Sequence, residues 1–370
     1  MSKILIISGD TSGDLHAANL MKEILAHRPN TEFIGIGGEK MSAIGFQKII
    51  DLSEISVVGF WEVIKKIDKF LQLKSKIKQI IEKENISLFV PVDFPGFNLQ
   101  IAKLCKQNKI KVVWYIAPQL WAWGSNRAVK LKNNIDKLLA VFPFEEQYFQ
   151  KYEIDTEFVG HPLMDIPLFQ NSIKKWNERE DILLIMPGSR KQELEFHLPL
   201  LIKYSMIFKS QYPKFDIVFS IPSHIQKYIL SNFPGTKKLN IVNDSHKFMQ
   251  TSKIGLIKSG TANLEAALLG LPFAMFYRTS WFNYIIGKGM TNIPNFSIVN
   301  ILSNDKIVTE LIQAEMNLKN IDKYINDIIN NRQEYENIQK RFEQIRGLFA
   351  NKRASARAAQ VVLNYFESNE

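Results

Sequence analysis

The sequence is poor in cysteine and contains no long hydrophobic run. The one cysteine, Cys105, excludes an internal disulfide and fits a reducing compartment. No stretch approaches the roughly 18 consecutive apolar residues that a membrane-spanning helix needs. The apolar run over residues 3–8 is too short for a signal peptide and predicts a first strand instead. We therefore expect a cytoplasmic protein.

The common metal and hydrolase motifs are also missing. The six histidines show no metal-ligand spacing. The sequence contains no HExxH, CxxC or GxSxG pattern. Metalloenzymes and serine hydrolases therefore lose their usual support, and we expect no metal site.

Acidic residues are fewer than basic ones, which gives a net charge of +10. This excess favours anionic partners such as phosphates, nucleic acid or an acidic membrane face. The positive charge is spread along the chain, and no zinc finger or RNP-like aromatic motif accompanies it. Nucleic acid is therefore the weaker explanation, and we expect no nucleic-acid partner.

With 370 residues, the chain is long enough for two domains. Its content of 46% hydrophobic and 23% charged residues is typical of a globular protein. Strand-like apolar runs alternate with helical patterns up to about residue 162, and the alternation starts again at Ile182. This pattern predicts α/β domains, each with a parallel sheet covered on both faces. We expect one domain over 1–163, a second over 164–345, with helices from Lys306 onward, and a C-terminal helical segment over 346–370.

Two loops of the second half are candidate anion sites. Residues 187–190 (PGSR) join an apolar run to a probable helix that begins at Lys191. Backbone N–H groups at such a helix start, with the Ser189 hydroxyl and the Arg190 guanidinium, form a phosphate site. Ordinary turn chemistry is the alternative. Residues 258–265 (KSGTANLE) also start a helix, where Glu265 either complements the helix dipole or binds ribose hydroxyls.

The first half has comparable loops. Residues 9–14 (GDTSGD) follow the first strand, where open α/β sheets bind ligands, although Ser12 or Asp14 could simply cap the next helix. The apolar run 88–92 ends in Asp93. A carboxylate at a strand tip beside apolar residues is a candidate general base. The alternative is a turn aspartate without a catalytic role.

Residues 57–81 predict a basic amphipathic helix, with apolar side chains at helical spacing and lysines elsewhere on the wheel. Such a helix either lies in a membrane interface or packs on the protein core. Two tryptophans, Trp121 and Trp123, lie in a predicted loop, where they must pack or bind something.

Six motifs together resemble one known family. They are GDTSGD (9–14), DFPGFN (93–98), QLWAW (119–123), FVGHP (158–162), PGSR (187–190) and SGTANLE (259–265). Their order and spacing are similar to those of lipid-A-disaccharide synthases, which are glycosyltransferases of the GT-B type. The resemblance covers nearly the whole chain. It implies two Rossmann-like domains facing a cleft, with C-terminal helices that pack back or are exchanged between subunits.

The resemblance also implies an activity. The family transfers a diacylated glucosamine from UDP to the 6-hydroxyl of a diacylglucosamine 1-phosphate, with inversion, to form the β-1,6 disaccharide of lipid A. It needs no metal or organic cofactor. The expected partners are these two substrates, the inner-membrane surface on its cytoplasmic face, and a second copy of the chain.

Residue roles follow from the same resemblance. Asp93 matches the catalytic aspartate, Ser189 and Arg190 match the diphosphate-side residues, Glu265 matches the ribose carboxylate, and Asn300 matches a site asparagine. The other expected substrate-binding residues are Ser12, Gly13, Asp10, Asn98, Ser259, Gly260 and Thr261. The expected membrane-contact residues are Phe60, Ile64, Ile67 and Leu71, because acyl chains need an apolar surface.

The sequence departs from the family at three of these places. Asp10 stands where Glu is usual, Gly96 stands where many members have a second Asp, and Val299 replaces a proline before Asn300. Asp93 therefore has no neighbouring carboxylate in its own loop. Three alternatives stay open: another GT-B protein such as a UDP-sugar epimerase or a peptidoglycan transferase, a non-catalytic nucleotide-sugar or lipid binder, and a basic nucleic-acid binder.

Overall fold

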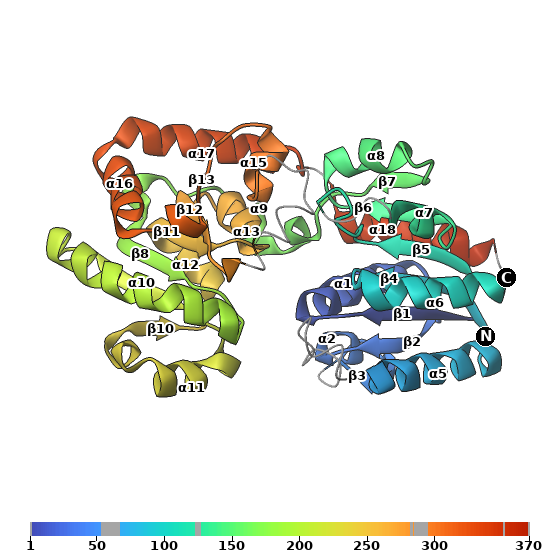
Figure 1. Ribbon diagram of the computed structural model, residues 1–370. Helices are drawn as coiled ribbons and strands as arrows, with labels where there is room; N and C mark the ends of the chain where they lie inside the picture. The colour runs from blue at the N-terminus through green and yellow to red at the C-terminus, as the bar shows by residue number, and fades with distance from the viewer. Residues whose placement is uncertain are drawn as a thin grey trace. The chain divides into compact units, whose positions relative to one another are not determined.

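The computed structural model describes residues 2–52, 67–122, 127–281, 284, 295–350 and 352–368, with the side chains of 67–69 left out. The chain divides into two compact units (Figure 1). Unit 1 comprises Met1–Ile166 with Asn351–Glu370, and unit 2 comprises Pro167–Ala350. Each unit is a parallel sheet between helices, as the alternating sequence pattern predicts.

Unit 1 is built on a seven-stranded parallel sheet with the order β3-β2-β1-β4-β5-β6-β7. The strands are β1 (Lys3–Ser8), β2 (Glu32–Gly37), β3 (Gln47–Asp51), β4 (Ile86–Val92), β5 (Lys111–Tyr115), β6 (Lys137–Ala140) and β7 (Thr156–Phe158). The central strands β1 and β4 are mostly apolar because helices cover both of their faces.

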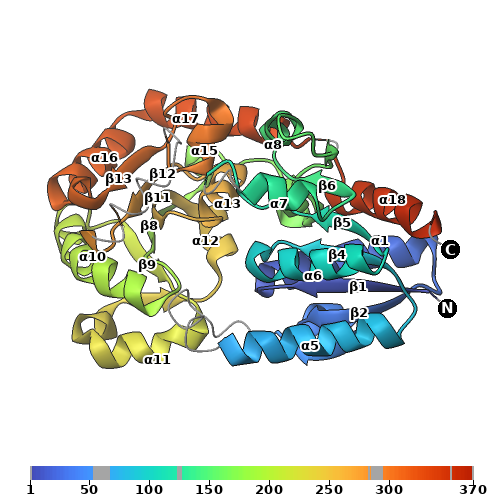
Figure 2. The same cartoon turned by 45° about the vertical axis from the view of Figure 1, so that its right-hand side comes forward.

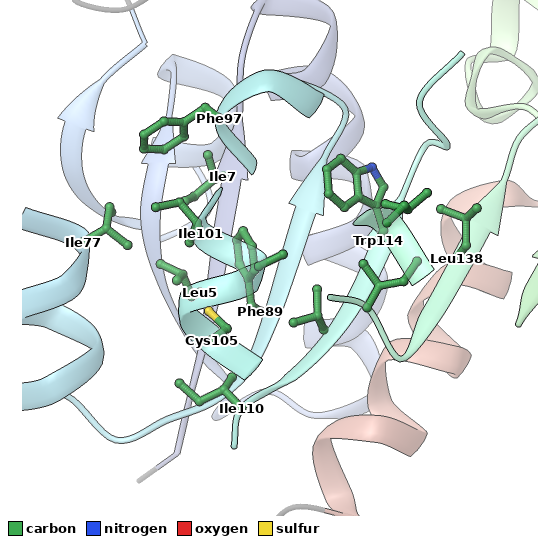
Figure 3. Close-up of a cluster of buried hydrophobic side chains, with 14 of the residues drawn as sticks. Leu5, Ile7, Ile77, Phe89, Phe97, Ile101, Cys105, Ile110, Trp114 and Leu138 are labelled. Carbon is green, nitrogen blue, oxygen red and sulfur yellow. The ribbon is translucent and has the colours of Figure 1, made fainter. Parts of the chain in front are cut away.

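Successive side chains of β1 point to opposite faces of the sheet and enter different cores. Leu5 packs with Ile77 of α5 and Ile101 of α6, in the cluster of Figure 3. Ile6 packs in a second cluster with residues of α1 and α18. The helices of unit 1 are α1 (Thr11–His27), α2 (Glu39–Ser42), α5 (Ile67–Lys83), α6 (Pro95–Gln107), α7 (Ala128–Lys132), α8 (Pro143–Gln150), η2 (Pro162–Asp165) and α18 (Ala354–Glu367).

The C-terminal helix α18 belongs to unit 1, although unit 2 precedes it in the chain (Figure 2). Its apolar side chains share a core with α1. At its start, the Ser355 N–H donates to the Asp165 carboxylate at 2.8 Å, and Arg357 binds Glu157 at 2.7 Å. The helix therefore packs back on its own chain, one of the two arrangements expected for this segment.

Unit 2 has a six-stranded parallel sheet with the order β10-β9-β8-β11-β12-β13. The strands are β8 (Glu180–Met186), β9 (Asp216–Ser220), β10 (Asn240–Val242), β11 (Ser252–Lys258), β12 (Phe273–Tyr277) and β13 (Thr309–Ile312). The helices are α9 (Pro167–Gln170), η3 (Trp176–Glu178), α10 (Lys191–Gln211), α11 (Ser223–Asn232), η4 (Pro234–Lys238), α12 (Ser245–Thr251), α13 (Ala262–Leu268), α15 (Ile298–Ser303), η5 (Gln313–Glu315), α16 (Leu318–Asn330) and α17 (Arg332–Gly347).

The expectation of helix from Lys306 onward is wrong at its start. Residues 309–312 form β13, which pairs in parallel with β12, and the long helices begin only at Leu318. The apolar residues near position 310 fit either structure, and pairing with β12 decides in favour of a strand. Among the described residues, no helix is long and apolar enough to cross a membrane.

Candidate functional site

In both sheets, most of the candidate substrate-binding residues follow the two strands between which the strand order reverses; Asn300 on α15 is the exception. In unit 1 these strands are β1 and β4, and in unit 2 they are β8 and β11. The connections that follow two such strands run to opposite sides of the sheet. In open α/β folds, ligands bind between these connections, at the carboxyl ends of the strands. The fold therefore groups the residues of these loops into one set on each unit.

Asp93 lies in a strained turn directly after β4. Asp93 and Phe94 both have left-handed backbones, with φ of 50° and 52°. For residues other than glycine this costs on the order of 1–3 kcal/mol each, and such strain concentrates at functional sites. Gly9 makes room for the turn, because a Cβ at Gly9 would lie 2.3 Å from the Phe94 ring.

Asn98 holds this turn in place. Its Nδ2 donates to the Asp93 carbonyl oxygen at 2.7 Å and to the Ile7 carbonyl oxygen at 3.3 Å, and the residue is fully buried. These contacts tie the turn after β4 to the neighbouring strand β1. Asn98 was expected to bind substrate, and the structure gives it this backbone role within the unit.

Partial burial of the Asp93 carboxyl raises its pKa to about 6, with a further increase from the charge of Asp10. The Phe94 N–H partly opposes the shift. The residue as a whole is exposed, so solvent screens part of these interactions. A carboxyl with a pKa near 6 is ionised at neutral pH and can accept a proton more readily than an ordinary aspartate.

The loop 9–14 supplies the neighbouring charge. Asp10, rather than Ser12 or Asp14, caps α1, because its Oδ1 accepts from the Gly13 N–H at 2.7 Å. Asp14 instead accepts from the Gly38 N–H at 2.7 Å and so ties α1 to the segment after β2. Ser12 is exposed on the first turn of the helix, next to the buried Gly13.

The sequence did not single out Glu145, a second carboxylate that interacts electrostatically with Asp93. Glu145 is fully buried at the start of α8, and burial raises its pKa to about 7 against the opposing effect of its hydrogen bonds. It accepts from the Trp121 indole at 3.0 Å and from the Phe142 N–H at 3.0 Å. Trp121 is thereby fixed by packing and a hydrogen bond, one of the roles expected for the loop tryptophans.

The candidate membrane helix reaches the same turn through aromatic contacts. The Phe70 ring of α5 lies 5.9 Å from that of Phe97 and 6.5 Å from that of Phe94, between centroids. Leu71, the next residue of α5, points away from this packed face and is 58% exposed. Phe60 and Ile64 lie outside the described residues, and Ile67 begins α5 without a described side chain.

In unit 2, the loop after β8 starts the long helix α10, as expected. Arg190 is the N-cap residue and is exposed, and Ser189 is exposed beside it. The half-buried Glu193 of the first turn faces both of them: its Oε2 accepts from the Ser189 N–H at 3.2 Å, and its Oε1 lies 3.6 Å from the Arg190 guanidinium. Lys258 also binds Glu193 Oε1, at 2.8 Å.

The loop after β11 lies beside the loop after β8 because the two strands pair. Ser259 is anchored by its N–H to the Phe276 carbonyl oxygen at 2.9 Å. Thr261 is the N-cap residue of α13 but makes no side-chain cap hydrogen bond. Among the described residues, nothing lies within 4 Å of a Cβ built on Gly260, which leaves its backbone open to a ligand.

Glu265 has a partner that the sequence did not indicate. Its Oε2 lies 3.1 Å from His246 Nε2, and this hydrogen bond raises the pKa of His246. The histidine comes from α12, a segment without a recognisable motif. A ribose bound to Glu265 would share the carboxylate with His246.

Asn300 is fully buried on α15, and its amide is used within its own segment. Nδ2 donates to the Val308 carbonyl oxygen at 2.8 Å and to Glu310 at 2.9 Å, while Oδ1 accepts from the Val308 N–H at 2.8 Å. These hydrogen bonds of Asn300 therefore go to the segment that leads into β13, and not to Arg190, Glu193 or Lys258.

Within the part of the chain that the structure describes, no group of three or more His, Cys, Asp or Glu side chains could hold a metal ion. The two sets of residues differ in charge. Around Asp93 they are carboxylates, whereas Arg190 and Lys258 converge on Glu193. One set suits proton removal, and the other suits an anionic group.

Comparison of the sequence with known proteins identifies the family. The sequence profile described as lipid-A-disaccharide synthetase matches residues 4–364. The chain belongs to the lipid-A-disaccharide synthase family. The lipid-A-disaccharide synthase of a Sulfurihydrogenibium species is 33% identical, with all of both chains covered, and that of Persephonella marina is 33% identical over 98% of each. Members form the lipid A disaccharide by glycosyl transfer, and this chain is a glycosyltransferase.

Solved structures show the GT-B fold. The kitacinnamycin glycosyltransferase has a TM-score of 0.66 at 14% identity, covering 99% of each chain. The UDP-GlcNAc 2-epimerase of Neisseria meningitidis, solved with UDP-GlcNAc, has a TM-score of 0.65 at 14% identity over 99% of this chain and 100% of that one. The expected class of two Rossmann-like α/β domains is confirmed.

Proposed function

We propose that this family member joins UDP-2,3-diacylglucosamine to 2,3-diacylglucosamine 1-phosphate. The product is the β-1,6 lipid A disaccharide, UDP is released, and the anomeric centre is inverted. The observation that carries the proposal is the pair of chemically different residue sets at the two strand-order reversals, in a chain of this family. The reaction needs no metal or organic cofactor in this mechanism.

Asp93 is the proposed base. It removes the proton from the 6-hydroxyl of the acceptor while that oxygen attacks the sugar of the donor in a single displacement. Support comes from its raised pKa of about 6 and from the turn that Asn98 holds. Asp10, Ser12 and Gly13 are proposed to contact the acceptor from the neighbouring loop.

Unit 2 is proposed to bind the UDP portion. Arg190 and Ser189 stabilise the diphosphate, whose negative charge grows as the bond to the sugar breaks. Glu265 accepts the ribose hydroxyls, and the loop 259–261 contacts the nucleotide through its backbone. Asn300 acts at most indirectly, because its amide is already used.

We further propose that the protein works at the cytoplasmic face of the inner membrane. Acyl chains cannot remain in water, and the segment containing Phe60, Ile64, Ile67 and Leu71 supplies an apolar surface for them. The 58% exposure of Leu71 supports this surface. A homodimer that exchanges α18 remains a proposal from the family resemblance.

The test is incubation with both purified substrates, followed by mass spectrometry for UDP and the disaccharide. Formation of both, only when both substrates are present, is the expected result. Conversion of UDP-GlcNAc without any acceptor would instead identify a sugar epimerase. Binding of the donor without turnover would indicate a carrier and contradict the proposal.

A further inference from the structure

In unit 2, the Glu193 carboxylate contacts both the loop after β8 and the end of β11. The Glu193 carboxylate lies 2.8 Å from Lys258 Nζ and 3.6 Å from Arg190, and it accepts the Ser189 N–H at 3.2 Å. Its side chain is only 11% exposed. Two cations and a backbone N–H from both loops are thus gathered around one pair of oxygens.

These are the groups that a phosphate would also use. Charge-assisted bonds from lysine, arginine and backbone N–H groups are the strong contacts of phosphate sites. Ser189 and Arg190 already belong to the proposed diphosphate site. Lys258 stands at the end of β11, directly before the SGT segment 259–261, and no role has been assigned to it.

We infer that Lys258 binds the diphosphate of the donor, and that Glu193 holds Lys258 in the free protein and releases it to that diphosphate. This inference deepens the proposed function and rests on it. The same cations cannot serve two anions at full strength, since the carboxylate and the diphosphate repel each other at short range. Glu193 is therefore a competitor of the nucleotide.

The Lys258 side chain has room to move from the Glu193 carboxylate to the diphosphate. It is 20% exposed, and its flexible stem allows the ammonium group to turn. Nζ lies 5.6 Å from the centre of the Tyr277 ring, at the end of the adjacent strand β12. This aromatic face keeps the ammonium group at the ends of β11 and β12 when the carboxylate is displaced.

The experiment measures the affinity of the full-length protein for UDP by titration calorimetry, and for uridine by displacement of UDP. The variants are Lys258→Met, Lys258→Arg and Glu193→Gln. Lys253→Met is the matched control, because Lys253 lies at the other end of β11 and is also paired with a carboxylate, Asp181. Thermal unfolding checks that each variant is folded.

We expect Lys258→Met to weaken UDP binding by about tenfold or more, the scale of one charge-assisted contact. Uridine affinity stays at the wild-type value, and Lys258→Arg keeps most of the UDP affinity. Glu193→Gln should tighten UDP binding, because it removes the competing charge. Lys253→Met should change neither affinity.

Equal UDP affinity of wild type and Lys258→Met overturns the inference, as does an equal loss of UDP and uridine affinity. Weaker UDP binding by Glu193→Gln overturns the role of Glu193 as a competitor. If Lys258→Met does not fold, the double variant with Glu193→Gln removes both charges and must bind UDP more weakly than Glu193→Gln alone. Absence of UDP binding by the wild type would contradict the proposed function itself.

Discussion

Replacing Asp10 by asparagine tests whether the neighbouring charge controls the proposed base. Asparagine keeps an oxygen that can accept the Gly13 N–H, so the cap of α1 is retained. The substitution removes the negative charge that raises the pKa of Asp93. We therefore expect the pKa of Asp93 to fall and the enzyme to stay active at lower pH.

The magnitude follows from the two causes of the shift. The pKa of Asp93 rises from 3.8 to about 6, mainly through burial and secondly through Asp10. Removal of Asp10's charge must therefore lower the pKa by less than about two units, and solvent screening reduces the change further. At pH 5 the wild-type base is about one-tenth ionised, so relative activity there rises by less than about tenfold.

The assay is the pH dependence of kcat/KM, with each variant normalised to its own plateau near pH 8. This normalisation cancels any loss of acceptor binding that is the same at every pH. The control is Asp155→Asn, which removes one charge from an exposed ion pair with Lys137, before β7 in the same unit. The reasoning is refuted if the apparent pKa on the acidic side of the profile is the same in Asp10→Asn as in wild type, or if it shifts equally in the control.

Three further substitutions test the other assignments. Asp93→Asn should retain UDP affinity in calorimetry but lose about 100-fold or more in turnover, which is the usual contribution of a general base. Turnover near the wild-type value would show that Asp93 only shapes the turn. Arg190→Ala should weaken UDP affinity by about tenfold, and unchanged affinity would remove it from the site. Leu71→Ser should reduce sedimentation with anionic vesicles, whereas Val129→Ser, also 58% exposed, should not.

The fold was largely predictable because its central strands are buried on both faces. Runs such as 4–7 and 182–185 are continuously apolar, and turn residues follow them, which leaves little ambiguity. The edge strands β3 and β13 carry no such signal. Residues 47–51 are exposed or only half-buried, and β13 has only Leu311 fully buried, so pairing with a neighbour decides their structure.

The candidate loops were predictable from local chemistry, but their partners were not. Glu145 binds Trp121, and His246 binds Glu265, across 24 and 19 residues of sequence. No local motif links such residues, because only the order and register of the strands bring their loops together. The cap of α1 is neither of the two alternatives, Ser12 and Asp14, for a related reason: the Asp14 carboxylate accepts from the Gly38 N–H in the segment after β2, and Asp10 is the cap.

The two units show how one topology serves opposite electrostatic tasks. In unit 1, the loops at the strand reversal place Asp10 near Asp93, and the negative charge of Asp10 raises the pKa of Asp93 further above the increase that burial causes. In unit 2, the equivalent loops supply Lys258 and Arg190, which hold the pKa of Glu193 low despite its burial. The reversal of strand order is common to both units. Its chemistry depends on which few side chains follow each strand, so exchange of these residues, rather than of the sheets, should change what each unit binds.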